Sequence, residues 1–225
     1  MLDAIIVMAG RGVRSNMRVN KVFYKIHGKY VFLHAFDTIS NNLNINKVIL
    51  VVSPIDELRV KKIMNSYDSN KYEITKGGNS RQESVYNGLQ KVSTKEVIIH
   101  DGARPFVSAE SISSIIENIQ LHGVATLALK AVDTFKLVQD MTIVDSIDRE
   151  NLYSMQTPQG GVTEWFLEAH EKAKKTNFVA TDDITLIQKF TKKKIKVVEG
   201  NLENIKITTP QDFKIAKAIS NGRKK

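Results

Sequence analysis

The sequence has 225 residues, 42% of them hydrophobic and none of them cysteine, and its formal net charge at pH 7 is +9. A chain of this length can bury one substantial core, so we expect a single domain over residues 1–225. The lack of cysteine excludes disulfides, thiolate metal ligands and a cysteine nucleophile. No run of about eighteen apolar residues occurs, and the N-terminal stretch lacks the features of a signal peptide. We therefore expect a cytoplasmic protein with no membrane partner.

The positive charge raises nucleic acid as a binding partner, because clustered lysine and arginine attract phosphate. Much of the excess lies in short runs such as Lys192–Lys194 and Arg223–Lys225, which are typical of solvated surface. We therefore expect no nucleic-acid partner, and a non-catalytic basic nucleic-acid-binding protein remains a remote alternative.

The first half of the chain alternates short apolar runs with segments of helical spacing. The apolar runs lie at Ala4–Met8, Val48–Val52, Val97–Ile99 and Val124–Leu129. The segments of helical spacing lie at Val31–Ile39, Ile55–Met64, Val85–Leu89 and Ile112–Ile119. This alternation predicts crossover units around a mostly parallel sheet, covered by helices on both sides because the strands are apolar on both faces. The expected fold is an α/β, Rossmann-like three-layer sandwich.

The pattern changes at Thr134–Met155, where short alternating pieces surround a turn near Gln139–Met141. This change predicts a protruding antiparallel β-hairpin arm at about residues 133–155. Beyond the arm we expect helices at Trp165–Ala173 and Ile184–Phe190, a strand near Ile195–Val198, and a helix beginning at Pro210.

The first predicted strand runs directly into the segment AGRGVRSNMRVNK, residues 9–21. Its glycines, Gly10 and Gly12, let a ligand approach the backbone amides, which can then donate to phosphate oxygens. The dinucleotide and Walker patterns do not fit, because Ser15 replaces the third small residue and no GK[ST] follows. The segment also carries four cations, Arg11, Arg14, Arg18 and Lys21. Taken alone, it is either a triphosphate-binding loop at the carboxyl end of a strand or an ordinary turn with solvated cations.

Further motifs along the chain resemble a single family. They are GGNSRQESVYNGL from Gly77, HDGARP from His100, DTFK from Asp133, DRENLYSMQTPQ from Asp148, TDD from Thr181 and NIKITTP from Asn204. Together with AGRGVR and Lys21, these motifs resemble the 2-C-methyl-D-erythritol 4-phosphate cytidylyltransferases over nearly the whole chain and in the same order. The resemblance implies a fold of nucleotidyltransferase type. It also implies transfer of a cytidylyl group from CTP to 2-C-methyl-D-erythritol 4-phosphate, in isoprenoid precursor synthesis, with a divalent cation, usually Mg²⁺. The products would be 4-CDP-2-C-methyl-D-erythritol and pyrophosphate.

The resemblance also implies roles for individual residues. Arg14 and Lys21 correspond to the two transition-state stabilisers of the family, whereas Arg11 and Arg18 become surface charges. The expected nucleotide-binding residues are Met8, Ala9, Gly10, Gly12, Gly78, Asn79, Ser84, Asp101, Gly102 and Arg104. Among these, Gly78, Asn79 and Ser84 would meet the base, and Asp101 would also bind the metal, because carboxylate oxygen suits Mg²⁺. A helix cap is the alternative role of Asp101, and Ser80 with Glu83 fits a capping box.

For the sugar-alcohol phosphate, the resemblance implies binding by Thr134, Arg149, Thr181 and Lys206. In the family, the arm that carries Thr134 and Arg149 reaches the neighbouring subunit, which implies a homodimer with shared active sites. Hairpin pairing and solvation are the alternative roles of these two residues. The alternative substrate is ribitol 5-phosphate or another polyol phosphate, because a sister group shares several of the motifs.

Four positions depart from the family pattern. Met8 and Gly102 stand where alanine is usual, Ser15 stands where methionine is frequent, and Asn20 stands where proline commonly precedes the lysine. We expect Gly102 to change little sterically and Asn20 to leave the backbone before Lys21 freer than proline would. The five histidines show no metal-ligand spacing and are expected to be packing or surface residues.

Overall fold

The computed structural model describes residues 1–10 and 20–223. Its strands are β1 (Leu2–Val7), β2 (Lys25–Ile26), β3 (Lys29–Tyr30), β4 (Ile45–Val52), β5 (Tyr72–Lys76), β6 (Glu96–Asp101), β7 (Val124–Lys130), β8 (Phe135–Gln139), β9 (Thr142–Ile147), β10 (Tyr153–Val162) and β11 (Lys196–Glu199). Its α-helices are α1 (Val31–Ser40), α2 (Glu57–Met64), α3 (Arg81–Leu89), α4 (Ala109–His122), α5 (Thr163–Lys175), α6 (Asp183–Phe190) and α7 (Pro210–Gly222). Short 3-10 helices occur at Lys21–Phe23, Pro54–Asp56 and Ser69–Lys71.

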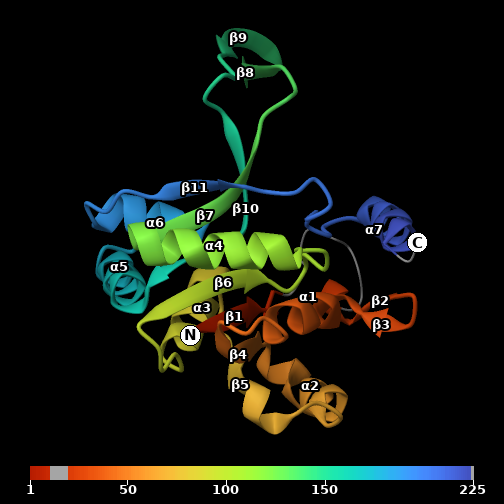
Figure 1. Cartoon of the computed structure of the whole chain (residues 1–225). Helices are drawn as coiled ribbons and strands as arrows, with labels where there is room; N and C mark the ends of the chain where they lie inside the picture. Colours follow the sequence, from red (N-terminus) through yellow and green to blue (C-terminus); the bar gives the residue numbers. More distant parts are fainter. Residues whose placement is uncertain (11–19, 224–225) are drawn as a thin grey trace.

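A seven-stranded sheet in the order β11-β7-β10-β6-β1-β4-β5 forms the centre of the molecule (Figure 1). β1 pairs in parallel with β4 and β6, and among the described strands of this sheet only β10 runs antiparallel to its neighbours. The apolar runs of the sequence therefore form strands, as predicted. Strands that are buried on both faces are apolar along their whole length rather than alternating between apolar and polar residues.

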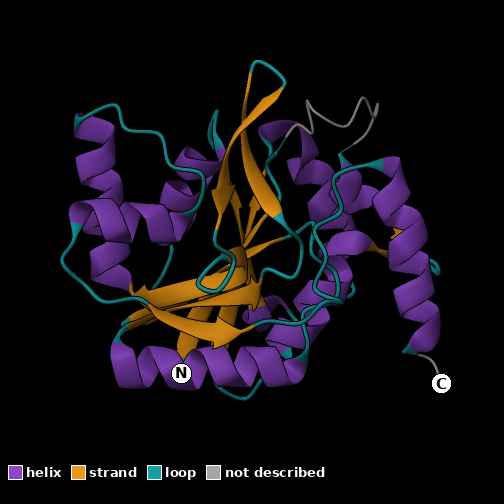
Figure 2. Cartoon of the chain, turned by 90° about the horizontal axis from the view of Figure 1, so that it is seen from above, coloured by secondary structure: helices purple, strands orange, loops and turns teal. Residues whose placement is uncertain are grey.

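Helices cover both faces of this sheet (Figure 2). On one face, Phe32 and Phe36 of α1, Met64 of α2 and isoleucines of α4 pack against the sheet. On the other face, residues of α3, α5 and α6, such as Leu89 and Phe166, form a second core. The α/β three-layer sandwich is thus confirmed. A smaller cluster packs α7 against β2.

The strand β10 was not predicted, and the expected hairpin ends too late. The hairpin proper is β8–β9, whereas residues from Tyr153 onward already pair with β7 in the main sheet. β10 carries few apolar side chains, since its buried residues include Gln156, Thr157 and Gln159. Its glycines are required by close packing, because a Cβ on Gly160 would lie 2.3 Å from the carbonyl oxygen of Val97.

The hairpin β8–β9 projects from the sheet as an arm (Figure 1). Its turn contains Asp140 and Met141, both with positive φ. The arm exposes several large apolar side chains, namely Phe135, Leu137, Val138, Met141, Ile143 and Val144. Exposed apolar side chains gathered on one projecting element are a feature of protein–protein contacts.

Two predicted helix starts are observed. Thr209 caps α7 in a complete capping box with Asp212, and Pro210 occupies the first turn. At α3, the Ser80 hydroxyl accepts a hydrogen bond from the Glu83 amide. The capping box expected there is only half formed, because the Glu83 carboxylate accepts from the Asn79 amide at 2.8 Å rather than from Ser80. Within residues 1–10 and 20–223, no helix is long and apolar enough to cross a bilayer.

Candidate active site

Three of the predicted site segments meet at the carboxyl edge of the sheet. The Met8 amide donates to the Val51 carbonyl at 2.8 Å, and the Gly102 amide donates to the Val7 carbonyl at 2.9 Å. The Gly77 amide donates to the Val52 carbonyl at 2.7 Å. The ends of β1 and β6 and the segment that follows β5 therefore lie side by side, as expected for ligand binding in an open α/β sheet.

Gly102 is sterically required beside Met8. An ideal Cβ on Gly102 would lie 2.9 Å from Met8 Cγ and 3.1 Å from the Val7 carbonyl oxygen. The expectation that Gly102 changes little sterically is therefore wrong, because the larger Met8 side chain occupies the space that a methyl group would need.

The predicted base-reading segment is braced by its own hydrogen bonds. The Ser84 hydroxyl is buried, donates to the Ser80 carbonyl at 2.7 Å and accepts from the Gly78 amide at 3.0 Å. Gly77 lies against Ala9, since a Cβ on Gly77 would lie 2.4 Å from the Ala9 Cβ. Ser84 thus holds the turn at Gly78, while Asn79 is exposed beside it.

Asp101 ends β6 and is surrounded by three cations. Its Oδ1 accepts from Arg81 Nε at 3.1 Å, and its Oδ2 lies 2.7 Å from Lys206 Nζ. The Nε of Arg104 lies 3.8 Å from the same Oδ2. Burial alone would raise the pKa of Asp101, but the three cations outweigh burial and hold this pKa well below its usual range. Asp101 is therefore a carboxylate at neutral pH, and it is not a helix cap.

Arg81 is a central site residue that the sequence did not single out. Besides Asp101, its guanidinium contacts Asp183 Oδ2 at 2.8 Å, and the Asp183 side chain is 1% exposed. Burial opposes its charge, but the two carboxylates outweigh burial and raise the pKa of Arg81. Arg81 thus links helix α3 to the end of β6 and to α6. Its partners lie 20 and 102 residues away in sequence, so no local pattern reveals them.

Lys206 and Thr181 lie at the same cleft. A cavity of about 250 Å³ is lined by residues that include Arg81, Asp101, Arg104, Thr181 and Lys206. Lys206 is placed there because the Ile207 amide donates to the Ala103 carbonyl at 2.9 Å. Four predicted residues, Asp101, Arg104, Thr181 and Lys206, are therefore brought together.

The other two predicted substrate-binding residues lie elsewhere. Thr134 and Arg149 are exposed on the arm segment, and Arg149 donates to the Val132 carbonyl at the arm's base. Neither residue lines the cleft within this chain. Lys21 opens the first 3-10 helix. Gly12 and Arg14, with Arg11 and Arg18, lie outside the described residues.

His100 organises the turn that carries Asp101 and Arg104. Its Nε2 lies 2.9 Å from the Arg104 carbonyl oxygen, which can only accept, so Nε2 carries the proton. Its Nδ1 then accepts from the Thr157 hydroxyl at 3.0 Å, and that hydroxyl accepts from the Asp101 amide at 3.1 Å. Burial lowers the pKa of His100 to about 4, which keeps the ring neutral. This histidine is a packing residue, as expected.

Two carboxylates, Asp101 and Asp182, line this cleft. Both oxygens of Asp182 accept hydrogen bonds, from Thr185 and from Gln159, so Asp101 is the carboxylate at the cleft that we consider for a divalent cation. Among the described residues, no group of three or more histidine, aspartate or glutamate side chains could hold a metal ion. Asp101 suits a cation such as Mg²⁺, which uses one or two carboxylates and takes its other ligands from phosphates and water. The residues therefore fit a cation that arrives with a triphosphate rather than a site built from protein ligands alone.

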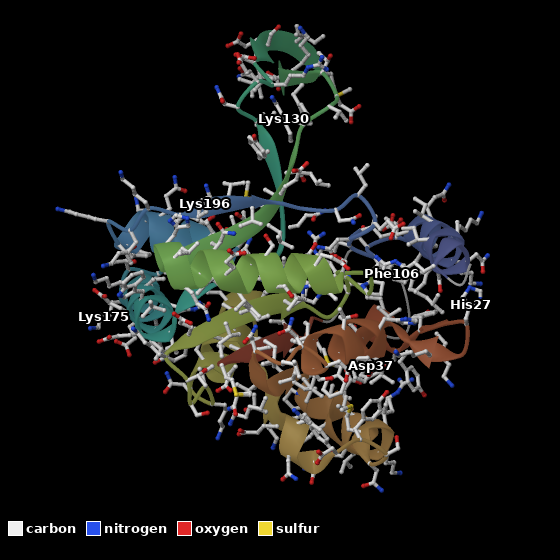
Figure 3. The ribbon with its side chains drawn as sticks, in the orientation of Figure 1. His27, Asp37, Phe106, Lys130, Lys175 and Lys196 are labelled. Carbon is white, nitrogen blue, oxygen red and sulfur yellow. The ribbon has the colours of Figure 1, made fainter. Side chains whose placement is uncertain are left out.

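A larger hollow, of about 1180 Å³, lies away from these residues. It is lined by residues of α1, the β2–β3 turn and the segment before α4, including His27, Asp37 and Phe106. Figure 3 labels these three residues at the right of the molecule. None of the predicted site residues that the structure describes lines this hollow, so we place the chemistry at the smaller, more highly charged cleft.

A Rossmann-like sandwich whose carboxyl edge gathers cations around one carboxylate defines an α/β protein of nucleotidyltransferase type. Residues 2–221 match the family model of 2-C-methyl-D-erythritol 4-phosphate cytidylyltransferase. The chain therefore belongs to this family.

Curated relatives agree with this assignment. A protein of this name from Caldanaerobacter subterraneus is 40% identical over 223 residues, and one from Geobacillus kaustophilus is 36% identical over 219 residues. Each alignment covers 96% of this chain and 96% of the relative.

Solved structures share the fold. A 4-diphosphocytidyl-2C-methyl-D-erythritol synthase from Anaerococcus prevotii superposes with a TM-score of 0.87 at 33% identity, covering 97% of this chain and 95% of that one. The 2-C-methyl-D-erythritol 4-phosphate cytidylyltransferase from Thermus thermophilus gives a TM-score of 0.82 at 28% identity, with 98% of both chains covered. The likeness extends over the whole length of these enzymes.

Proposed function

We propose that this protein transfers the cytidylyl group of CTP to 2-C-methyl-D-erythritol 4-phosphate. The observation that carries this proposal is the cleft where Arg81, Asp101, Arg104 and Lys206 meet in a chain of this family. A phosphate oxygen of the alcohol phosphate attacks the α-phosphorus of CTP. The new P–O bond forms as the bond to the β-phosphate breaks, so pyrophosphate leaves with the electron pair.

Positioning and charge neutralisation account for the proposed catalysis. Arg14 and Lys21 neutralise the charge that develops on the transferring and leaving phosphates. Thr181 and Lys206 hold the alcohol phosphate, with Thr134 and Arg149 supplied by an arm. Lys206 would leave Asp101 Oδ2, 2.7 Å away in this structure, to reach that phosphate. A divalent cation such as Mg²⁺, held by Asp101, would neutralise further phosphate charge. We also propose a cytoplasmic location, as expected from the sequence.

The test of the substrate is pyrophosphate release with CTP and each alcohol phosphate in turn. We expect turnover with 2-C-methyl-D-erythritol 4-phosphate and little turnover with ribitol 5-phosphate. Addition of a chelator should stop the turnover until Mg²⁺ is restored. Rapid turnover of ribitol 5-phosphate alone would replace the proposed substrate with the alternative. Steeply salt-dependent duplex binding without CTP-dependent activity would instead favour a nucleic-acid-binding protein.

We also propose a homodimer in which the arm completes the partner's site. Two features support this: the exposed apolar side chains of the arm, and the exposed positions of Thr134 and Arg149 away from the cleft of their own chain. Mixing inactive Arg14→Ala chains with inactive Arg149→Ala chains should restore part of the activity, because one site per mixed dimer then has both arginines. Verified mixed dimers without any recovery would show that each site is built within one chain.

A further inference from the structure

Asn20 joins two parts of the site that lie twelve residues apart in sequence. Its side-chain Nδ2 donates to the Met8 carbonyl oxygen at 2.8 Å. Its Oδ1 accepts from the Val22 amide at 3.4 Å, which is a longer bond. The amide side chain therefore uses both of its ends, one on the end of β1 and one on the turn that begins at Lys21.

The Met8 end of this contact is firmly held. The Met8 amide donates to the Val51 carbonyl in β4, and Met8 is only 2% exposed. Its Cγ occupies the space above Gly102, beside the turn that carries Asp101. The hydrogen bond to the Met8 carbonyl therefore fixes the position of Asn20 relative to the carboxyl edge of the sheet.

The other side of Lys21 is held by the core. Val22 and Phe23 are buried, and the Phe23 ring packs edge-on against Phe32 of α1 with ring centroids 6.1 Å apart. The Phe23 amide also donates to the Asn20 carbonyl at 3.0 Å. The backbone of Lys21 is therefore fixed on one side by these buried residues and on the other by Asn20.

We propose that Asn20 is a positioning residue that sets the place of Lys21 relative to the end of β1 and to Asp101. This inference rests on the proposed function, in which Lys21 stabilises the transition state. It reverses the expectation that Asn20 leaves the backbone before Lys21 freer than proline would, because two side-chain hydrogen bonds restrain this residue. Displacing a catalytic group lowers turnover more than substrate binding.

Two substitutions separate the bond to Met8 from the bond to Val22. Asn20→Ala removes both, whereas Asn20→Asp keeps the acceptor for Val22 but replaces the donor to Met8 with a carboxylate oxygen. Since both variants lose the shorter bond, to the Met8 carbonyl, we expect each to lower kcat by about 3- to 10-fold, with the KM for the alcohol phosphate changed by less than about twofold. Asn65→Ala, at the exposed end of α2, is the matched control. Wild-type kcat in Asn20→Asp would overturn the role of the Met8 contact.

A double-mutant cycle tests whether the effect passes through Lys21. Single-turnover rates, with enzyme in excess, are measured for Asn20→Ala, Lys21→Gln and the double variant. If Asn20 positions Lys21, the Asn20→Ala effect should largely disappear in the Lys21→Gln background. An undiminished effect there would overturn the proposal and leave Asn20 a merely structural residue. A wild-type protein without CTP-dependent turnover would instead refute the proposed function, so the two failures are distinguishable.

Discussion

At the scale of single residues, three cations of the site surround the carboxylate of Asp101. Arg81 is the one among them that also pairs with a second carboxylate. Arg81 joins Asp101 to the buried Asp183, with its Nε 3.1 Å from the first carboxylate and its NH2 2.8 Å from the second. A buried carboxylate that loses its partner costs far more free energy than the pair contributes. The pairing therefore sets both the stability of this edge and the orientation of Asp101.

We predict that Arg81→Ala lowers the free energy of unfolding by about 3–5 kcal/mol, because Asp183 is left buried without its cation. The free energy of unfolding of Arg81→Lys should lie between the values for Arg81→Ala and the wild type. The ammonium group keeps the charge, but it cannot bridge both carboxylates as the planar guanidinium does. Urea unfolding measures both values. A change below about 1 kcal/mol in Arg81→Ala would contradict this account of the ion pairs.

The neutral state of His100 predicts a pH dependence of stability. Its pKa is about 4 in the folded protein and about 6.5 in an unfolded chain. Between these values the unfolded chain binds more protons, so the free energy of unfolding falls as the pH falls from 6.5 to 4, by at most about 3 kcal/mol. His100→Gln should reduce this dependence, whereas His122→Gln, at an exposed position, should preserve it. Equal pH profiles for the wild type and His100→Gln would argue against the buried neutral ring.

At the scale of elements, continuous apolar character made β1, β4, β6 and β7 predictable, whereas it could not reveal β10. The strand β10 is buried through hydrogen-bonded polar side chains and glycines, such as Gln159 and Gly160. The cleft was predictable in part, because Asp101 and Lys206 belong to recognisable motifs. Arg81 was not, because only the fold brings Asp183 to it.

The contact between the end of β1 and the turn after β6 gives a prediction about coupling. Gly102→Ala should destabilise the wild type by about 1–3 kcal/mol, because the new Cβ meets Met8 Cγ at 2.9 Å. In the Met8→Ala background the same substitution should cost about 1 kcal/mol less, since the obstructing side chain is gone. Urea unfolding of the four proteins gives the coupling. Strict additivity would show that Met8 does not set the need for glycine.

At the scale of the whole molecule, charged side chains line the cleft at the carboxyl edge of the sheet, and the arm extends from the sheet (Figure 1). Within one chain, Asp101, Arg104, Thr181 and Lys206 share the cleft, while Thr134 and Arg149 do not. A site completed by a second chain would account for this division.

Transfer of the cytidylyl group carries the α-phosphorus of CTP into the product, so a label at that phosphorus tests the proposed reaction most directly. With α-³²P-labelled CTP, 2-C-methyl-D-erythritol 4-phosphate and Mg²⁺, we predict that the label enters a CDP-alcohol, with one pyrophosphate released per label transferred. Without the alcohol phosphate, the label should remain in CTP. Label recovered as CMP whether or not the alcohol phosphate is present, or no consumption of CTP by the folded protein, would contradict the account.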